Sequence, residues 1–564
     1  MSDASHPPAA TDAGLLAQLQ RAHGLYKQNQ LAQARDLCHA VLAVKPRSFD
    51  ALHLLGQIAF RAAEHEAAAA AFGRALDIKP GNATVQNNRG LALMALGRWG
   101  EALACFDAAL ALKPDIAGAH VNQGHAHGKL HRPAAALASY DAALALTPQD
   151  AQTWHARAGV LYRLGRIEDA VHSYDRAIAL DSRLADAWSN RGLALLDLGR
   201  RAQAEESFAA ALAVDPDHAD GHWNLSLCAL QRGDFKTGWA HHEWRWKARG
   251  LNLAPSAFAQ PQWQGESLSG KTILLHADQG YGDALQFVRY AAVLARQGAR
   301  VYLRVQKPLL DLLAGCEGVT QVFTRDAALP AFDVHCPLGS LPSLFQSDAD
   351  TIPAAGGYLR SAPEKRTAWK SVLGPAGRPR IGLVWRGSAA HKNDHNRSIP
   401  LADLLAGLPE GFAYISLQKD IADADRMLAQ TRPDIRVLDS QLADFSDTAA
   451  VCDLLDVVIS VDTSVAHLAG ALGRPVWLLL PFNPDWRWQL ERADSPWYAS
   501  ARLYRQNRAG GLARGLRALT CGPGEHPARP NGRPNGRLNG RMPMSRGDGR
   551  GTPEGFTHGP SAPC

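Results

Sequence analysis

The fold of the first half of the chain is decided by the 34-residue stretch GNATVQNNRGLALMALGRWGEALACFDAALALKP at positions 81–114. Its landmarks are two small residues, Gly90 and Ala102, an aromatic residue, Phe106, and a final proline, Pro114. The same residue types return at the same spacing on both sides, with small residues at Ala34, Ala68, Ala136, Ala170 and Ala204 and prolines at Pro46, Pro80, Pro148 and Pro216. Such a unit predicts two closely packed helices, because proline cannot continue the second helix.

This pattern resembles the tetratricopeptide repeat. Six copies extend over about 15–218, and a divergent seventh unit reaches about 250. We therefore predict a disordered N-terminus over 1–14 and an all-α superhelical solenoid over 15–250. The seventh unit is rich in aromatic residues, which we expect to cap the solenoid by packing: Trp223, Phe235, Trp239, Trp244 and Trp246.

A row of asparagines exceeds what packing of the repeats requires. These residues lie two positions before the small residue of their repeat, or its equivalent: Asn88, Asn122, Asn190 and Asn224. Two positions correspond to about 200° of helix, so the amides point toward the inner groove, where they can bind a peptide backbone. The row resembles the asparagine ladder of O-linked N-acetylglucosamine transferases, although Leu54 and Ala156 interrupt it. The alternative is that asparagine is simply tolerated on a solvated face.

From about 271 the hydrophobic period changes to that of alternating strands and helices. Gly-rich and Pro-rich segments divide this region into halves over 256–365 and 376–508, each with a Rossmann-like pattern. One helix is expected over 285–296. Strands are predicted at 271–276, 300–305, 319–323 and 333–336 in the first half, and at 380–385, 412–417, 435–438, 457–461 and 475–480 in the second.

The most specific motif follows the predicted strand 457–461 and opens a helix. It runs Asp462-Thr463-Ser464-Val465-Ala466-His467 and continues to Pro475. Free N–H groups at a helix N-terminus can hold a diphosphate, and a carboxylate at the strand tip can accept hydrogen bonds from sugar hydroxyls. We therefore predict donor-binding roles for the six residues 462–467.

The motif, together with the turn Gly280-Tyr281-Gly282-Asp283 and the segment Arg397-Ser398-Ile399-Pro400, resembles heptosyltransferase-like GT-B enzymes. The resemblance covers about 271–506, and the whole chain resembles bacterial repeat-bearing relatives of O-linked N-acetylglucosamine transferase. It implies a GT-B module, in which two Rossmann-like domains face a cleft. It also implies that Asp283 is the catalytic base beside a Gly-rich loop containing Gly280 and Gly282.

Two departures from the family are visible. Arginine replaces the usual lysine at Arg397, although Lys392 is close enough in sequence to supply a point charge to a phosphate. The ribose-binding acid of the family has no obvious counterpart, since the corresponding segment is Gln418-Lys419-Asp420.

Each proposed site residue also has a plainer interpretation. Asp283 could cap the helix that follows it, and Asp462 could be an ordinary N-cap. His467 lies among small residues and could be a packed core histidine. Scattered Asp-x-Asp triplets give no consistent metal site, so no metal and no cofactor is expected beyond the nucleotide sugar, which is a co-substrate.

Composition excludes several other classes of protein. The net charge is +6, but eight arginines against three acidic residues in 509–564 contribute +5 of it, so the body lacks the basic face of a nucleic-acid binder. The eight cysteines are far apart, which favours a reducing compartment, and no targeting or membrane-spanning segment is recognisable. A cytoplasmic protein is expected.

The end of the chain is predicted to be disordered. Residues 509–564 are rich in Arg, Gly and Pro, with near repeats of Arg-Pro-Asn-Gly and no core-forming pattern. Because a closing helix would be expected after about 506 in the family, we hypothesise that a reading-frame change replaced the native end.

These observations together predict a metal-independent, inverting glycosyltransferase that moves a sugar from a nucleotide sugar to a hydroxyl acceptor. The acceptor is expected to be a protein or peptide that binds in the solenoid groove. Two alternatives stay open, a non-catalytic interaction scaffold with an inactive α/β part and a sugar-nucleotide epimerase that needs no acceptor.

Overall fold

The computed structural model of the protein describes residues 12–251, 253–354, 356–388 and 394–506. The predicted disordered tail over 509–564 and the first eleven residues lie outside this part. The first helix begins at Asp12, so Asp12–Gly14, which we expected to be disordered, belong to a helix.

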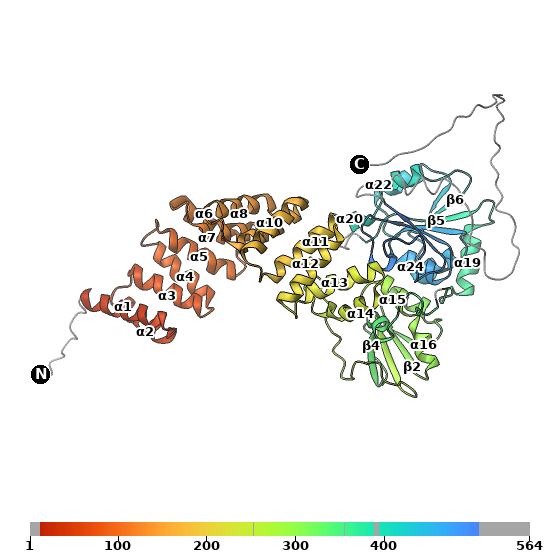
Figure 1. The fold of residues 1–564 in the computed structure, drawn as a ribbon, viewed down its shortest axis with the longest axis horizontal. Helices are drawn as coiled ribbons and strands as arrows, with labels where there is room; N and C mark the ends of the chain where they lie inside the picture. Colours follow the sequence, from red (N-terminus) through yellow and green to blue (C-terminus); the bar gives the residue numbers. More distant parts are fainter. Residues whose placement is uncertain (1–11, 252, 355, 389–393, 507–564) are drawn as a thin grey trace, which may run out of the picture. The chain divides into compact units, whose positions relative to one another are not determined.

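Within the described part of the chain, residues 12–242 form fourteen helices that contact one another in consecutive pairs (Figure 1). Their bounds follow the 34-residue period of the sequence, so the predicted helical solenoid is confirmed. The helices are Asp12–Lys27 (α1), Leu31–Val44 (α2), Phe49–Arg61 (α3), His65–Leu76 (α4), Ala83–Ala95 (α5), Trp99–Leu112 (α6), Ala117–Lys129 (α7), Pro133–Leu146 (α8), Ala151–Arg163 (α9), Ile167–Leu180 (α10), Ala185–Asp197 (α11), Arg201–Val214 (α12), Ala219–Arg232 (α13) and Phe235–His242 (α14).

Glycines let the two helices of a repeat approach each other. A Cβ atom built on Gly56, Gly90, Gly124 or Gly192 would lie only 2.4 to 2.6 Å from a ring carbon of Phe72, Phe106, Tyr140 or Phe208, respectively. All four rings are buried. The recurrence of glycine and of an aromatic ring is thus one packing contact, repeated along the solenoid.

Helix α7 offers a direct test of this contact. We expect Gly124→Ala to destabilise the protein by about 1 to 3 kcal/mol, because the new methyl group overlaps the Tyr140 ring. The matched control is Gly118→Ala in the same helix, where a Cβ meets no atom within 4 Å. There the change should be neutral or stabilise by up to about 1 kcal/mol, since alanine favours helix. Urea unfolding of both variants measures the difference, and equal stabilities would contradict the packing argument.

The first sheet of the α/β region has four parallel strands in the order β3-β2-β1-β4. Its strands are Thr272–His276 (β1), Arg300–Val305 (β2), Val319–Thr324 (β3) and Val334–Pro337 (β4), all within two residues of the predicted ones. Helix α16 packs on β2 and β3 (Figure 1). Because all four strands are parallel, their carboxyl ends share one edge, where ligands bind in such folds.

The single helix predicted over 285–296 is two helices, Tyr281–Phe287 (α15) and Tyr290–Arg296 (α16). The break falls at Arg289, whose side chain is buried. Its guanidinium donates to the backbone carbonyls of Gln286 and Trp497 and to the hydroxyl of Tyr358. The buried guanidinium of Arg289 donates to the carbonyl of Gln286. It therefore competes with the backbone N–H groups that would continue the helix past this point.

The second sheet has six parallel strands in the order β10-β9-β8-β5-β6-β7. Counted from its own first strand, this is the order 6-5-4-1-2-3 of a doubly wound dinucleotide-binding sheet. Five strands were predicted, and the edge strand β10 was not. The strands are Arg380–Val384 (β5), Ala413–Ser416 (β6), Ile435–Val437 (β7), Val457–Val461 (β8), Val476–Leu480 (β9) and Ala501–Arg505 (β10).

Short helices and 3₁₀ turns connect these strands. They are Glu243–Trp246 (η1), Lys307–Leu309 (η2), Leu310–Leu313 (α17), Leu338–Ser340 (η3), Leu341–Leu344 (α18), Pro363–Leu373 (α19), Asp394–Arg397 (α20), Leu401–Ala406 (α21), Asp423–Gln430 (α22), Phe445–Cys452 (α23), Ser464–Ala471 (α24) and Trp486–Trp488 (η4). No helix in the described ranges is both long and apolar enough to cross a bilayer.

The aromatic residues of the seventh unit do more than end the solenoid. The buried indole of Trp239 in α14 lies 5.4 Å from that of Trp486, edge to face, and its Nε1–H donates to the carbonyl of Ser347. Gln231 in α13 donates to the carbonyl of Pro484. These side chains therefore join the last helices of the solenoid to the α/β region rather than only cap the repeats.

Candidate functional site

The order of the second sheet defines where a ligand would bind. The strand order switches between β5 and β8, because the chain adds strands on one side of β5 first and on the other side afterwards. In parallel sheets, ligands usually bind in the crevice outside the carboxyl ends of the strands at this point. Asp462 directly follows β8, and Arg397 ends α20, which follows β5 in the chain. The guanidinium of Arg397 donates to the carbonyl of Asp462 at 3.0 Å and pairs with Asp394 at 3.2 Å. Two predicted donor-binding residues thus meet at the predicted edge.

The carboxyl of Asp462 is held in a low-polarity setting. Its side chain is 15% exposed, and burial raises its pKa to about 6. The negative charge of Asp485 contributes to this rise, and the positive charges of Arg487 and Arg397 limit it. A ligand that donates hydrogen bonds to this carboxylate would therefore stabilise its charged form.

Helix α24 begins directly after this strand tip. The N-cap is Thr463, whose side chain makes no capping bond, and the backbone N–H groups of Ser464 and Val465 have no acceptor among the described residues. The N–H of Ala466 is not free, because it donates to the carbonyl of Thr463 at 3.0 Å. Two free donors at a helix N-terminus remain to receive an anion.

His467 is packed in the interior of the protein, in agreement with the interpretation that it is a core histidine. Its ring is buried, its Nδ1 lies 2.9 Å from the hydroxyl of Tyr498, and it packs beside Trp488. Burial holds the pKa of His467 well below its usual range, so the ring is neutral. The ring also touches the Gly-rich loop, since a Cβ on Gly282 would lie 2.8 Å from its Cδ2. Glycine at 282 is required for this approach between the two sheets.

Asp283 is the third residue of α15 and caps that helix. Its Oδ2 accepts the backbone N–H of Gly280 at 2.8 Å, as the helix-cap alternative predicted. Its Oδ1, however, is bound by the guanidinium of Arg487, which comes from the second sheet's region. Burial raises the pKa of Asp283, and Arg487 opposes that rise. Capping alone does not require this second, charged partner.

Arg487 is the residue that the sequence analysis missed. It lies in η4, after the carboxyl end of β9, and pairs with both Asp283 and Asp485. It also donates to the side-chain oxygen of Gln286 at 2.6 Å. A signal was present in the sequence, because Asp485 and Arg487 alternate with Trp486 and Trp488 just beyond a strand end, where ligands of parallel sheets bind.

One predicted cation cannot be placed. Lys392 lies outside the described residues, so its role stays a prediction. In the described ranges, no group of three or more His, Cys, Asp or Glu side chains is arranged to hold a metal ion.

The predicted asparagine row connects consecutive repeats. The amide nitrogen of Asn122 donates to the side-chain oxygen of Asn87 at 3.2 Å. Those of Asn88 and Asn190 lie 3.5 and 3.1 Å from the Nε2 atoms of His53 and His155, whose pKa values burial lowers. Each contact joins residues that are 35 positions apart in the sequence, and each uses the side-chain nitrogen of the asparagine. The fourth member, Asn224, is 8% exposed and is the least accessible of the row.

Asp462→Asn should change how stability depends on pH. The folded-state pKa of about 6 exceeds the unperturbed 3.8, so the native state binds this proton more tightly than the unfolded chain. Stability is therefore lost as pH rises from about 4 to 6, and asparagine avoids this loss. The melting temperature of the variant minus that of the parent should be more positive at about pH 7.5 than at about pH 5. A pH-independent difference would contradict a raised pKa.

The family models match the helical part of the chain. Family models described as tetratricopeptide repeats match residues 19–83, 87–151, 159–199 and 189–237. Protein FlbA of Caulobacter vibrioides is 26% identical in an alignment of 306 residues, and the match covers 49% of this chain and 50% of FlbA. The chain therefore spans about half the length of this curated relative.

Two solved structures illustrate the similarity. PilF of Pseudomonas aeruginosa is 22% identical, with a TM-score of 0.34 over 37% of this chain and 96% of that one. PilW, described as a widely conserved type IV pilus biogenesis factor, is 25% identical, with a TM-score of 0.35 over 38% of this chain and 100% of that one. The segments that the family models match are tetratricopeptide repeats, and an α/β region with two parallel sheets follows them.

Proposed function

We propose that the protein is a glycosyltransferase that moves a sugar from a nucleotide sugar to a hydroxyl group of a protein bound by the solenoid. The observation that carries the proposal is the meeting of Asp283, Arg487 and Asp462. These three charged residues come from the first sheet's Gly-rich loop and from two strand ends of the second sheet. Carboxylates with raised pKa values gather at functional sites, and burial raises the pKa of both Asp283 and Asp462 here.

The donor would bind at the edge of the second sheet. Its diphosphate would receive the free N–H groups of Ser464 and Val465, together with the positive end of α24. Arg397 already fixes the strand tip, and Asp462 would accept a hydroxyl of the sugar or ribose. No metal ion enters this scheme, since cations and a helix terminus can neutralise the leaving diphosphate.

Asp283 would remove the proton of the acceptor hydroxyl. The acceptor oxygen then forms a bond to the anomeric carbon from the side opposite the diphosphate, which leaves with the electron pair of the broken C–O bond. The configuration of the sugar is therefore inverted. Arg487 now occupies Oδ1 of Asp283, and a bound diphosphate would compete for this arginine. Binding of the donor would thereby release Asp283 to act as base.

Titration with a panel of nucleotide sugars tests the proposal. A donor at about 100 times its dissociation constant should stabilise the protein by about 2.7 kcal/mol. Asp462→Asn should weaken this effect, because a charge-assisted hydrogen bond to a hydroxyl is lost. If no nucleotide sugar stabilises the parent protein, the transferase proposal fails.

The asparagine row should affect the use of acceptors alone. We expect the variant with alanine at positions 88, 122, 190 and 224 to bind donors like the parent but to transfer sugar poorly to a long peptide or protein. The matched control replaces Gln33 and Gln203, exposed amides on α2 and α12, and should change neither property. Unchanged transfer by the four-alanine variant would mean that the row does not bind the acceptor.

A non-catalytic interaction scaffold is the second candidate. It is favoured by one observation, that both carboxylate oxygens of Asp283 already have partners in Gly280 and Arg487. In that case the cluster would only hold the two sheets together. Capture of a protein partner that is lost in the four-alanine variant, without any binding of nucleotide sugars, would support the scaffold.

A further inference from the structure

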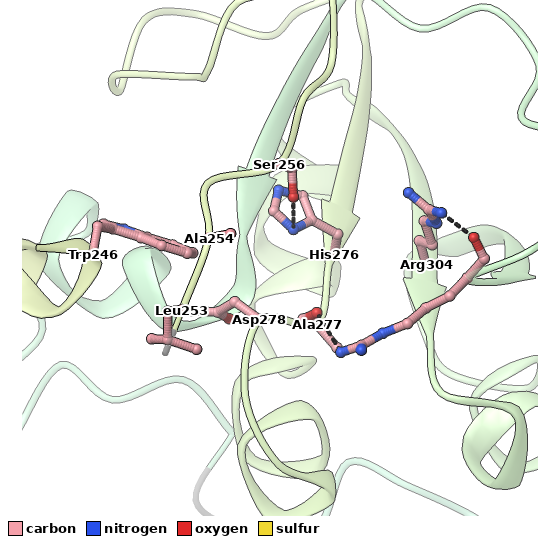
Figure 2. Close-up of a pocket in the computed structure, with 9 residues that line it drawn as sticks. Trp246, Leu253, Ala254, Ser256, His276, Ala277, Asp278 and Arg304 are labelled. Atoms are coloured by element: carbon pink, nitrogen blue, oxygen red, sulfur yellow. Dashed lines mark hydrogen bonds between the residues drawn. The ribbon is translucent and has the colours of Figure 1, made fainter. Parts of the chain in front are cut away.

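A cavity of about 350 Å³ lies above the carboxyl ends of the first sheet (Figure 2). Its floor is formed by the end of β1 at His276 and Asp278, the end of β2 at Arg304, and Arg325 just after β3. Neither Asp283 nor Asp462 lines it. Its volume is at the lower end of the range for small-molecule pockets, roughly 300 to 1,000 Å³.

The charged lining of the cavity is positive. Arg304 donates to the carbonyl of Arg325, and Arg325 donates to that of Ala277 at 3.3 Å, so both guanidinium groups keep further donors. The Nε of Arg304 is buried and has no hydrogen-bond partner. Burial without a partner is costly for a charged group, and the negative charge of an anion in the cavity would offset part of that cost without touching Nε itself.

Nearby carboxylates do not cancel this charge. Asp278 and Glu243 share the guanidinium of Arg245, which lies 3.1 Å from Asp278, so these three groups leave one negative charge against the two arginines of the cavity. The exposed Asp326 is hydrogen-bonded to Thr324, and this bond lowers its pKa the most. The positive charges of Lys307 and Arg304 lower the pKa of Asp326 as well.

Two histidines beside the cavity add no positive charge. His276 lies 3.1 Å from His335, and burial lowers the pKa of His276 to about 3. Burial also lowers the pKa of His335. The ring of His276 is therefore neutral at physiological pH and can exchange a hydrogen bond with Ser256, 3.4 Å away.

The opposite wall is apolar and comes from the end of the solenoid. Trp246, the last residue of η1, presents its ring beside Leu253 and Ala254 (Figure 2). The ring is held in place, because Nε1–H donates to Glu243 at 3.2 Å and the guanidinium of Arg245 stacks on it at 4.6 Å. A fixed aromatic face across the cavity from two arginines suits a ligand with a flat apolar part at one end and an anionic group at the other.

We propose that this cavity binds a small molecule or chain segment that carries a carboxylate or phosphate beside a flat apolar face. The anion pairs with Arg304 and Arg325, and the apolar face packs on Trp246. The site joins the solenoid to the first sheet and is independent of the proposed sugar transfer.

Calorimetric titration of the full chain with phenyl phosphate, benzoate, inorganic phosphate and benzyl alcohol tests this proposal. Phenyl phosphate and benzoate should bind, and their relative affinities show whether phosphate or carboxylate is preferred. Inorganic phosphate should bind more weakly because it lacks the ring. Neutral benzyl alcohol should not bind. If neither aromatic anion binds at millimolar concentration, the proposal is wrong.

Three variants locate the binding. Arg325→Gln, at an exposed residue, and Arg304→Gln should each weaken phenyl phosphate about tenfold or more through lost charge-assisted bonds. Trp246→Leu should remove the preference for phenyl phosphate over inorganic phosphate. The control Arg300→Gln removes the same charge from the exposed, opposite end of β2 and should change nothing. An equal loss in Arg300→Gln, or no loss in Arg325→Gln with an unchanged melting temperature, would overturn the assignment.

Discussion

Asp283→Asn should lower the turnover of sugar transfer by about 10² to 10⁴, the usual contribution of a positioned general base. The substitution keeps the shape of the side chain and an oxygen that can accept the N–H of Gly280, so helix α15 stays capped. Donor affinity should stay the same or rise, because Asp283 contacts no part of the donor in this scheme and its replacement frees Arg487 for the diphosphate. Rates with saturating donor and acceptor measure the effect.

The helix-cap interpretation makes a different prediction for the same variant. If Asp283 only caps α15 and pairs with Arg487, asparagine should change the melting temperature but not the rate per folded molecule. Turnover at the parental rate would therefore reject the base assignment. Asp447, a half-buried carboxylate paired with Lys365 in the second sheet's region, provides a control that should leave turnover unchanged when replaced by asparagine.

Arg487→Gln should cost about 3 kcal/mol of stability. It removes the partner of Asp283 and Asp485 and leaves their carboxylates partly buried without a positive charge. Breaking a buried ion pair costs about 3 to 5 kcal/mol, and the lower value applies because the side chain of Asp485 is 36% exposed. Chemical denaturation of the parent and the variant measures this loss.

A second substitution separates the ion pair from simple packing. Asp283→Asn in the Arg487→Gln background should recover part of the lost stability, since one unpaired carboxylate disappears. Arg492→Gln is the matched control, because its pair with Asp494 is exposed and should be worth less than about 1 kcal/mol. If the two substitutions are strictly additive, Arg487 does not stabilise the protein through Asp283.

The sequence predicted the local structure well where periodicity is strong. The spacing of Gly124 and Tyr140 recurs along the solenoid because each repeat solves the same local packing problem. The nine predicted strands of the α/β region were found for a similar reason, since buried parallel strands are short apolar runs between turns. Local patterns did not reveal the edge strand β10 or the break at Arg289, because both depend on contacts with distant segments.

The sequence by itself determined the repeat array, the two α/β halves and the position of Asp462 at the end of a strand. Only the tertiary structure decided which side chains meet. Asp283 and Arg487 are 204 positions apart, and nothing in either neighbourhood specifies the other. The same holds for the cavity, whose tryptophan comes from the solenoid and whose arginines come from the first sheet. Hydrophobic periodicity acts over a few residues, whereas a binding site is a convergence of segments that only folding brings together.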